Sequence, residues 1–404
     1  MNFTVARRVF CNLLSFRNSG YLRVAWRFAR LSIAIVVTAA WLFASSCGGG
    51  SPSSGGSGGG PQPSAKEALY LSSSSGQVLT FVFDTSSGTV GSPTLIAGPA
   101  SGVNIRVYPG GTFLYVSDFN SGSFYAYSIN QSTGALTPVS GSPFNHPSLS
   151  GHGGPIAIDP AGKYLFTCDA AGTIVSFTVD SQTGLLRPSG ATPVTDSQQP
   201  VYLLVDSTGK FLIASNHADS SGQNFSVFSI NPSTGVLIEV TGSPFTFGEN
   251  TQPEEILLNS GNSVLYAALS NSQQVNAIDF NSNTGRLTAI QGAPYPAGAM
   301  PTSIALAPSG GFLYAGNTGA GTVSQYSVNA STGALTPGNV VQVGNPSFLD
   351  FDSSGKFLLV IGESSDVLPI FKVDLTTGTL SPGNNANLPA GTNVRAASYL
   401  VSLQ

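Results

Sequence analysis

Charged, sulfur-containing and histidine side chains are rare in this chain. Asp, Glu, Lys and Arg make up 8% of its 404 residues, which include three cysteines, two methionines and three histidines. So few cysteines exclude a disulfide framework, and stability must come from burial of an apolar core. The sequence contains no His-x-x-x-His or Cys-x-x-Cys spacing and no Gly-Lys-Thr loop, and no Gly-x-Ser-x-Gly elbow follows a predicted strand. We therefore expect no metal and no cofactor.

Acidic side chains are absent from the first 46 residues, which carry six of the fifteen basic residues. An apolar run over residues 31–43 and the small residues 44–46 follow these arginines. This order predicts an export signal over residues 1–46. A transmembrane anchor is the alternative, but about 13 apolar residues are few for a bilayer span of about 20. From Cys47 onward nine basic residues stand against nineteen acidic ones, a formal charge of −10, which argues against a nucleic-acid partner.

Cys47 directly follows Ala-Ser-Ser, and this arrangement resembles a bacterial lipoprotein signal, in which the cysteine is lipidated. Residues 47–65 are almost wholly Gly, Ser and Pro, a composition typical of a flexible linker. We therefore expect an exported protein at the cell envelope of a bacterium, lipid-anchored in the periplasm or at the outer membrane, with no other membrane contact. A cleaved signal followed by a disordered spacer is the alternative.

A short polar turn that ends in glycine recurs seven times between residues 86 and 378. The steps between successive glycines are 46, 50, 51, 50, 48 and 45 residues. A period near 50 predicts a repeat architecture in which each unit buries its apolar face against its neighbours. The turn glycines are Gly88, Gly134, Gly184, Gly235, Gly285, Gly333 and Gly378.

Each repeat contains four predicted strands, as residues 301–337 show most clearly. Residues 301–307, 312–316, 322–328 and 334–337 read as strands separated by turns. Two positions of the first strand, eight and six residues before the second strand, are large and apolar in six successive repeats, from Ile105 and Val107 to Leu349 and Phe351. This period-2 pattern predicts inner strands packed on neighbouring units. Seven four-stranded units predict an all-β, seven-bladed β-propeller over residues 66–404.

The two ends of the chain complement each other. Residues 68–71 match a second strand with no first strand before it, whereas residues 394–401 match a first strand with nothing after it. The C-terminal strand is therefore predicted to close the first blade, which removes an open sheet edge.

The repeat over residues 301–337, with Pro-Ser-Gly-Gly-Phe-Leu-Tyr-Ala, Gly-Thr-Val-Ser-Gln-Tyr-Ser and Ser-Thr-Gly-Ala-Leu-Thr-Pro, resembles the seven-bladed lactonase family. That family includes 6-phosphogluconolactonase and carboxymuconate cycloisomerase-like proteins, and the resemblance covers residues 67–404. It implies a hydrolase that cleaves the internal ester of a lactone. The resemblance also implies histidines directly after the proline of a first strand, but Pro155, Pro200 and Pro301 precede Ile, Val and Thr.

Polar residues at the starts of the first strands are the candidates for a site at the central funnel. Lactone opening needs a base to activate water and a cation to stabilise the oxyanion. As catalytic residues we predict Glu254, Glu255 or His152 as the base and Arg106 as the cation. Predicted substrate-binding residues are Arg395, which can also serve as the cation, Asn104, Tyr202 and Asp350.

Each candidate also has a purely structural interpretation. Glu254 and Glu255 can be solvated rim residues, and Arg106 can pair with Asp350 across the hub. His152 and His146 lie in a loop rich in Gly, Pro and Ser, where a surface position is the default, and His217 reads as a turn residue.

Two functions therefore stay open. The first is an exported lactone hydrolase of the 6-phosphogluconolactonase type, and the second is a non-catalytic envelope propeller that binds a protein or a ligand at its central funnel. The expected partner is a small lactone or an envelope protein, and the expected state is a monomer.

Overall fold

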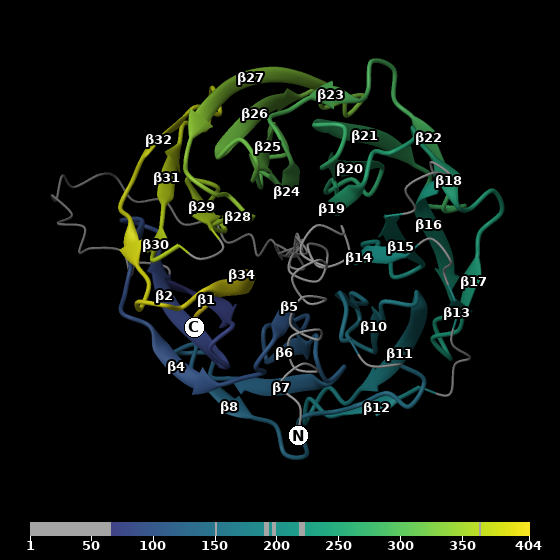
Figure 1. Ribbon diagram of the computed structural model, residues 1–404, viewed down its shortest axis with the longest axis vertical. Helices are drawn as coiled ribbons and strands as arrows, with labels where there is room; N and C mark the ends of the chain where they lie inside the picture. Colours follow the sequence, from purple (N-terminus) through teal and green to yellow (C-terminus); the bar gives the residue numbers. More distant parts are fainter. Residues whose placement is uncertain (1–65, 150–151, 190–193, 196–198, 218–222, 363–364) are drawn as a thin grey trace, which may run out of the picture.

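The computed structural model describes residues 66–149, 152–189, 194–195, 199–217, 223–362 and 365–404, with the backbone alone for residues 194–195 and 395–401. The predicted signal, Cys47 and the linker lie outside the described residues. Within these residues no helix is of a kind that could cross a bilayer. Seven antiparallel sheets form seven blades around one axis, and the first strand of each blade lies nearest the centre (Figure 1).

The first blade combines the two ends of the described chain. Its strand order is β3-β2-β1-β34, and β4 also pairs with β2. Pairing of β1 with β34 joins Leu71 to Ala397, so the C-terminal strand closes the ring as predicted. The bounds are β34 (Val394–Ser402), β1 (Lys66–Ser73), β2 (Gln77–Asp84), β3 (Thr89–Val90) and β4 (Thr94–Ala97).

The other six blades follow chain order, and each begins at the centre and ends at the rim (Figure 1). Blade 2 is β5 (Gly102–Val107), β6 (Phe113–Asp118), β7 (Phe124–Ile129) and β8 (Leu136–Pro138). Blade 3 is β9 (Ile156–Ile158), β10 (Tyr164–Cys168), β11 (Thr173–Val179), β12 (Leu186–Pro188) and β13 (Val194–Thr195). Blade 4 is β14 (Pro200–Val205), β15 (Phe211–Asn216), β16 (Gln223–Ile230), β17 (Leu237–Glu239) and β18 (Phe245–Thr246).

The last three blades repeat the same order. Blade 5 is β19 (Pro253–Leu258), β20 (Val264–Leu269), β21 (Gln274–Phe280), β22 (Leu287–Ala289) and β23 (Tyr295–Pro296). Blade 6 is β24 (Pro301–Leu306), β25 (Phe312–Asn317), β26 (Thr322–Val328) and β27 (Leu335–Gln342). Blade 7 is β28 (Phe348–Phe351), β29 (Phe357–Ile361), β31 (Ile370–Val373) and β32 (Leu380–Pro382), beside the small pair β30 (Val367–Leu368) and β33 (Ala386–Asn387).

The turn glycines join each blade to the blade before it. All seven have φ between 70° and 73°, a conformation that costs other residues about 1–2 kcal/mol. A Cβ atom on Gly184 would lie 2.5 Å from the ring of Phe113 in the preceding blade. On Gly88 it would lie 2.2 Å from Phe357 of blade 7, so the same contact closes the ring. Glycine is needed here for the turn and for the close approach.

A tyrosine hydroxyl strengthens this contact in four of the blades. Tyr115 donates a hydrogen bond of 3.0 Å to the Gly184 carbonyl oxygen, and burial raises the pKa of its hydroxyl, which keeps the donor protonated. Apolar side chains fill the rest of the space between blades, as where the rings of Phe124 and Phe177 meet edge to face with centroids 5.2 Å apart. The core therefore lies between adjacent blades.

Candidate functional site

The first strands of blades 2, 4, 5 and 6 each carry a β-bulge at their second residue. In β24, Pro301 pairs with Asn317 and Ser303 with Gly316, so Thr302 has no partner of its own. In β19, Glu254 and Glu255 lie between the pairs Pro253 with Leu269 and Ile256 with Ala267, so two residues face one. The corresponding shifts in β5 and β14 fall at Val103 and Val201. A bulge redirects its side chain out of the regular alternation.

In each of these four blades a backbone hydrogen bond joins the residue after the second strand to the residue before the first strand. His217 N–H donates to the Gln199 carbonyl at 3.1 Å, and Thr318 N–H donates to the Met300 carbonyl at 2.9 Å. Gln199, Gln252 and Met300 precede their strands with φ of 57°, 46° and 52°, a conformation that is strained for residues other than glycine. The residue after a second strand is thereby held beside the residue that precedes the first strand of the same blade.

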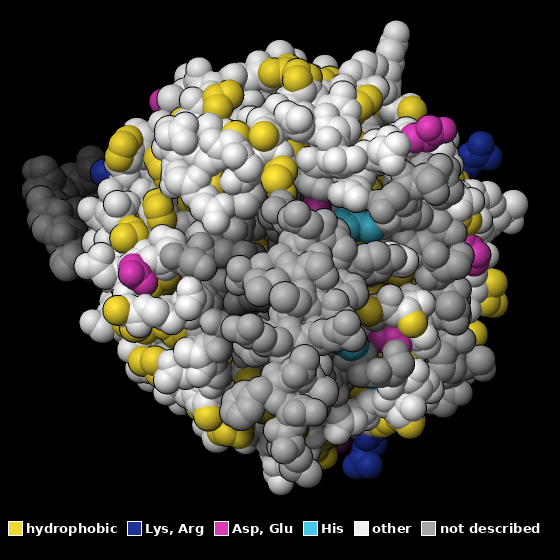
Figure 2. Space-filling model, in the orientation of Figure 1, with side chains coloured by type: hydrophobic (Ala, Val, Ile, Leu, Met, Phe, Trp, Pro, Cys, Tyr) yellow, Lys and Arg dark blue, Asp and Glu magenta, His cyan; other side chains and the backbone are white. Residues whose placement is uncertain are grey.

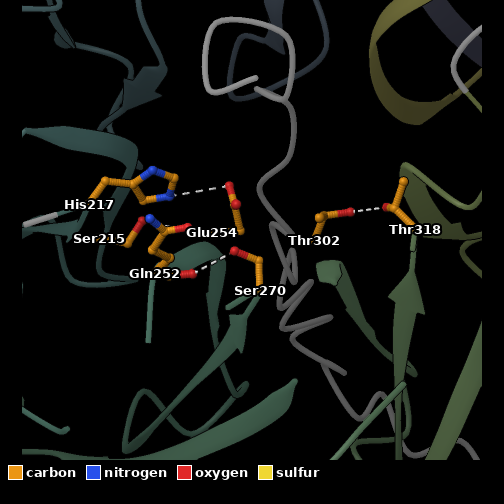
Figure 3. A network of polar contacts seen from close by, with 7 residues as sticks. All are labelled: Ser215, His217, Gln252, Glu254, Ser270, Thr302 and Thr318. Carbon is orange, nitrogen blue, oxygen red and sulfur yellow. Dashed lines mark hydrogen bonds and ion pairs between the residues drawn. The ribbon is translucent and has the colours of Figure 1, made fainter. Parts of the chain in front are cut away.

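His217 and Glu254 form the centre of a buried polar group at this end of blades 4 to 6 (Figure 3). His217 Nε2 lies 3.5 Å from Glu254 Oε2, and the side chains are 8% and 10% exposed. His217 comes from the end of β15 and Glu254 from the bulge of β19. On the face in Figure 2, histidine side chains lie nearer the middle than the rim, each beside an acidic side chain.

Hydroxyl groups hold the backbone around this pair in place. The Ser215 hydroxyl donates to the Glu254 carbonyl at 2.7 Å, and the Ser270 hydroxyl donates to the Gln252 carbonyl at 3.1 Å. Thr302 and Thr318 are hydrogen-bonded through their hydroxyls, and Thr318 donates to the Pro346 carbonyl at 3.1 Å. These hydrogen bonds fix the bulges of β19 and β24 relative to their neighbours. Together with His217 and Glu254 these residues make seven, which we name the polar end group: Ser215, His217, Gln252, Glu254, Ser270, Thr302 and Thr318.

Apolar residues take the equivalent positions in blades 2 and 4. Val103 and Val201 are buried in one cluster, against which Phe119 packs. The exposed His152 ring meets the Phe119 ring with centroids 4.7 Å apart. The bulge residue is therefore polar in blades 5 and 6 and apolar in blades 2 and 4.

A second polar chain lies one to three residues beyond the bulge residues of the first strands. Arg106 of β5 lies with its Cζ 5.3 Å from the centroid of the Tyr202 ring. The Tyr202 hydroxyl donates to Glu255 Oε1 at 3.3 Å, and the Ile304 N–H donates to Glu255 Oε2 at 3.1 Å. The chain thus joins buried side chains of blades 2, 4 and 5 to a backbone N–H of blade 6.

The predicted residues are thus divided between two groups. Glu254 lies in the polar end group, whereas Arg106, Tyr202 and Glu255 form the second chain. Burial of Glu254 and Glu255 argues against a solvated rim for either. His217, which the sequence pattern assigned to a turn, is instead the partner of Glu254. Its position directly after a second strand was the one signal that could have identified it.

The remaining predicted residues make other contacts. Asn104 accepts a hydrogen bond from the Ile156 N–H at 3.1 Å, which ties blade 2 to blade 3. Asp350 is buried and accepts from the Phe351 N–H at 2.8 Å. The described residues show no ion pair between Arg106 and Asp350, so the proposed pairing across the hub is not formed. The Arg395 side chain lies outside the described residues.

No three His, Cys, Asp or Glu side chains lie close enough to hold a metal ion within the described part of the chain. Cys168 is buried and donates its thiol to the Pro200 carbonyl at 3.6 Å. Its position is that of a packed core side chain.

A family model described as a lactonase with a seven-bladed β-propeller matches residues 75–205, 192–300 and 249–396. A 6-phosphogluconolactonase of Formosa agariphila is 36% identical over 87 residues, which is 21% of this chain. The match spans 24% of that relative's length.

Solved structures of similar propellers agree with the fold. A periplasmic gluconolactonase of Pseudomonas aeruginosa superposes with a TM-score of 0.68 and 19% identity over 84% of this chain and 99% of its own. A Bacteroides fragilis protein, provisionally named a 6-phosphogluconolactonase, superposes with a TM-score of 0.72 and 21% identity, covering 85% of this chain and 99% of its own. Identities this low establish the fold alone.

Proposed function

Because this chain belongs to the seven-bladed β-propeller lactonase family, we propose that it hydrolyses the internal ester of a lactone at the central end of blades 4 to 6. The observation that carries this proposal is the buried pair of His217 and Glu254, 3.5 Å apart. An imidazole next to a carboxylate is a suitable general base, because the carboxylate stabilises the imidazolium that forms.

The reaction adds one water to one lactone. His217 Nδ1, the ring nitrogen that does not face Glu254, takes a proton from the water as the water oxygen bonds to the lactone carbonyl carbon. The bond between that carbon and the ring oxygen then breaks, and His217 returns the proton to the ring oxygen, which becomes a hydroxyl. The product is a hydroxy acid, whose carboxyl group releases its proton to solvent.

The surroundings of the pair support this role. His217 and Glu254 are both nearly buried, which strengthens the interaction between a charged imidazolium and a carboxylate relative to water. The Ser215 hydroxyl fixes the Glu254 backbone, and the bulge of β19 removes Glu254 from the regular strand alternation. The pair is therefore held by backbone geometry on both sides.

The substrate we propose is a sugar lactone met outside the cytoplasm. The related Pseudomonas aeruginosa protein is a periplasmic gluconolactonase, and residues 1–46 of this chain, directly before Cys47, resemble a lipoprotein signal. The protein would then act as a monomer anchored by lipid at the cell envelope. Incorporation of labelled palmitate that is lost in Cys47→Ala would support the anchor.

Hydrolysis by the full-length protein over a panel of sugar and aromatic lactones, followed as acid release, tests the proposal. His217→Gln is expected to lower kcat by about 10²- to 10⁴-fold with little change in melting temperature. His146→Gln is the matched control, because His146 is also a buried histidine whose Nε2 lacks a hydrogen-bond partner among the described residues. That variant should keep full activity.

Two outcomes would contradict the proposal at different levels. Absence of hydrolysis for every lactone would leave the non-catalytic binding propeller. Equal activity of wild type and His217→Gln would show that the protein is a lactonase whose general base is not His217.

A further inference from the structure

Arg106 carries a buried guanidinium that its described surroundings satisfy only in part. The side chain is 2% exposed. Its Nη1 donates to the Ile105 carbonyl at 3.1 Å. Nε and Nη2 are fully buried and have no hydrogen-bond partner among the described residues. Removing a charged donor from water without a partner is costly, so buried guanidinium groups are normally paired.

No carboxylate of the described residues lies within ion-pair distance of Arg106. Glu255 is the acidic side chain linked to it most directly, through Tyr202. Both Glu255 oxygens already accept hydrogen bonds, from the Tyr202 hydroxyl and from the Ile304 N–H. Glu255 therefore orients the tyrosine ring and does not pair with the guanidinium.

The Tyr202 ring supports the guanidinium from one side. Arg106 Cζ lies 5.3 Å from the ring centroid, a cation–π distance. Arg106 reaches from blade 2 to a ring of blade 4, and blade 3 carries the small Ala157 at the repeat position equivalent to Arg106. This contact with the ring does not use the hydrogen-bond donors of the guanidinium.

We propose that the Nε and Nη2 edge of Arg106 binds a carboxylate at the centre of the ring. These two neighbouring N–H groups form the planar fork that matches the two oxygens of a carboxylate. The identity of the carboxylate rests on the proposed function, because lactone hydrolysis generates one in its hydroxy acid product. The binding itself requires only Arg106 and its support on Tyr202.

Calorimetric titration of the full-length protein with sodium gluconate and sodium acetate tests this site, with sodium chloride at equal ionic strength as the control. Both carboxylates should bind wild type, and chloride should not. Arg106→Met is expected to weaken binding by roughly 10- to 100-fold, the usual effect of losing a charge-assisted pair. Arg187→Met, which removes an exposed arginine from β12, should bind like wild type. Binding of neither carboxylate to wild type would overturn the assignment.

Melting temperature separates a binding role from a structural one. Without added carboxylate, Arg106→Met should melt at or above the wild-type temperature, because an apolar side chain of similar length leaves no unpaired charge buried. Arg106→Lys keeps the charge but not the fork and should bind gluconate less tightly than wild type. A large fall in melting temperature for Arg106→Met, with no gluconate binding to wild type, would show that Arg106 is paired within the chain and would overturn the proposal.

The test is independent of turnover. Glu254→Gln should retain gluconate binding even though it should hydrolyse lactones poorly. Gluconate binding without any lactone hydrolysis would contradict the proposed function and leave the Arg106 site standing. Lactone hydrolysis without gluconate binding would support the proposed function and overturn the Arg106 site.

Discussion

The outer turns of the seven blades are alike, because each has a glycine with φ between 70° and 73°. The bulges at the central ends of the first strands differ, because their residues are Val103, Val201, Glu254 and Thr302. The turns are uniform because each must accept a side chain of the preceding blade. The bulge residues vary because a bulge fixes the backbone and leaves its side chain outside the ladder. The same repeat therefore supplies a constant scaffold at the rim and variable chemistry at the centre.

We expect the largest effect when the bulge residue of blade 5 is replaced by that of blade 4. Glu254→Val removes the partner of His217, so lactone hydrolysis should fall by at least about 100-fold. The melting temperature should stay the same or rise, since valine already occupies the position in β14. Activity assays and thermal melts of the same preparation measure both effects. Retained activity would show that the central side chains do not carry the chemistry.

The scaffold half of the comparison can be tested with two glycines of equal φ. Gly184 and Gly310 both have φ of 73°, but a Cβ atom on Gly184 would lie 2.5 Å from Phe113, whereas nothing lies within 4 Å of one on Gly310. Gly310→Ala should cost about 1 kcal/mol of unfolding free energy. Gly184→Ala should cost about 3 kcal/mol, since overpacking adds to the conformational cost. Denaturant unfolding measures the difference, and equal costs would refute the role of the contact between blades.

The smallest expected effect concerns a buried carboxylate of the scaffold. Glu67 of β1 accepts the Ser353 N–H at 3.1 Å across the seam between blades 1 and 7. Burial raises the pKa of Glu67, and the nearby Asp352, whose own pKa is raised by burial, adds to this. As the pH rises above about 4, the Glu67 carboxyl loses its proton in the unfolded chain before it does so in the folded protein. Wild type therefore loses stability relative to Glu67→Gln as the pH rises.

Thermal melts of wild type and Glu67→Gln from pH 4 to pH 8 measure this effect. The variant should gain a small advantage as the pH rises, with lactone hydrolysis unchanged. Glu239→Gln, which removes an exposed carboxylate from β17, is the control for loss of one charge. A lower melting temperature of Glu67→Gln at pH 8 would mean that the ionised carboxylate stabilises the seam.

The predictions that rested on repeated residues were confirmed. The turn glycines, the apolar pairs such as Ile105 and Val107, and the complementary ends gave seven four-stranded blades closed by the C-terminal strand. These features recur with a fixed period, so each copy supports the others. The candidate site was predicted less completely, because Arg106 lies over Tyr202 and not beside Asp350, and His217 was taken for a turn residue. The catalytic and binding roles stay predictions.

The sequence by itself determined the number of blades, the order of their strands and the way the ring closes, because apolar periodicity and turn glycines act over short distances along the chain. Only the tertiary structure decided which polar side chains meet. His217 and Glu254 are 37 positions apart and belong to different blades. They face each other because β19 bulges at Glu254 and the Ser215 hydroxyl, two residues before His217, donates to the Glu254 carbonyl. Such contacts depend on register and bulges, which leave no periodic signal in the sequence.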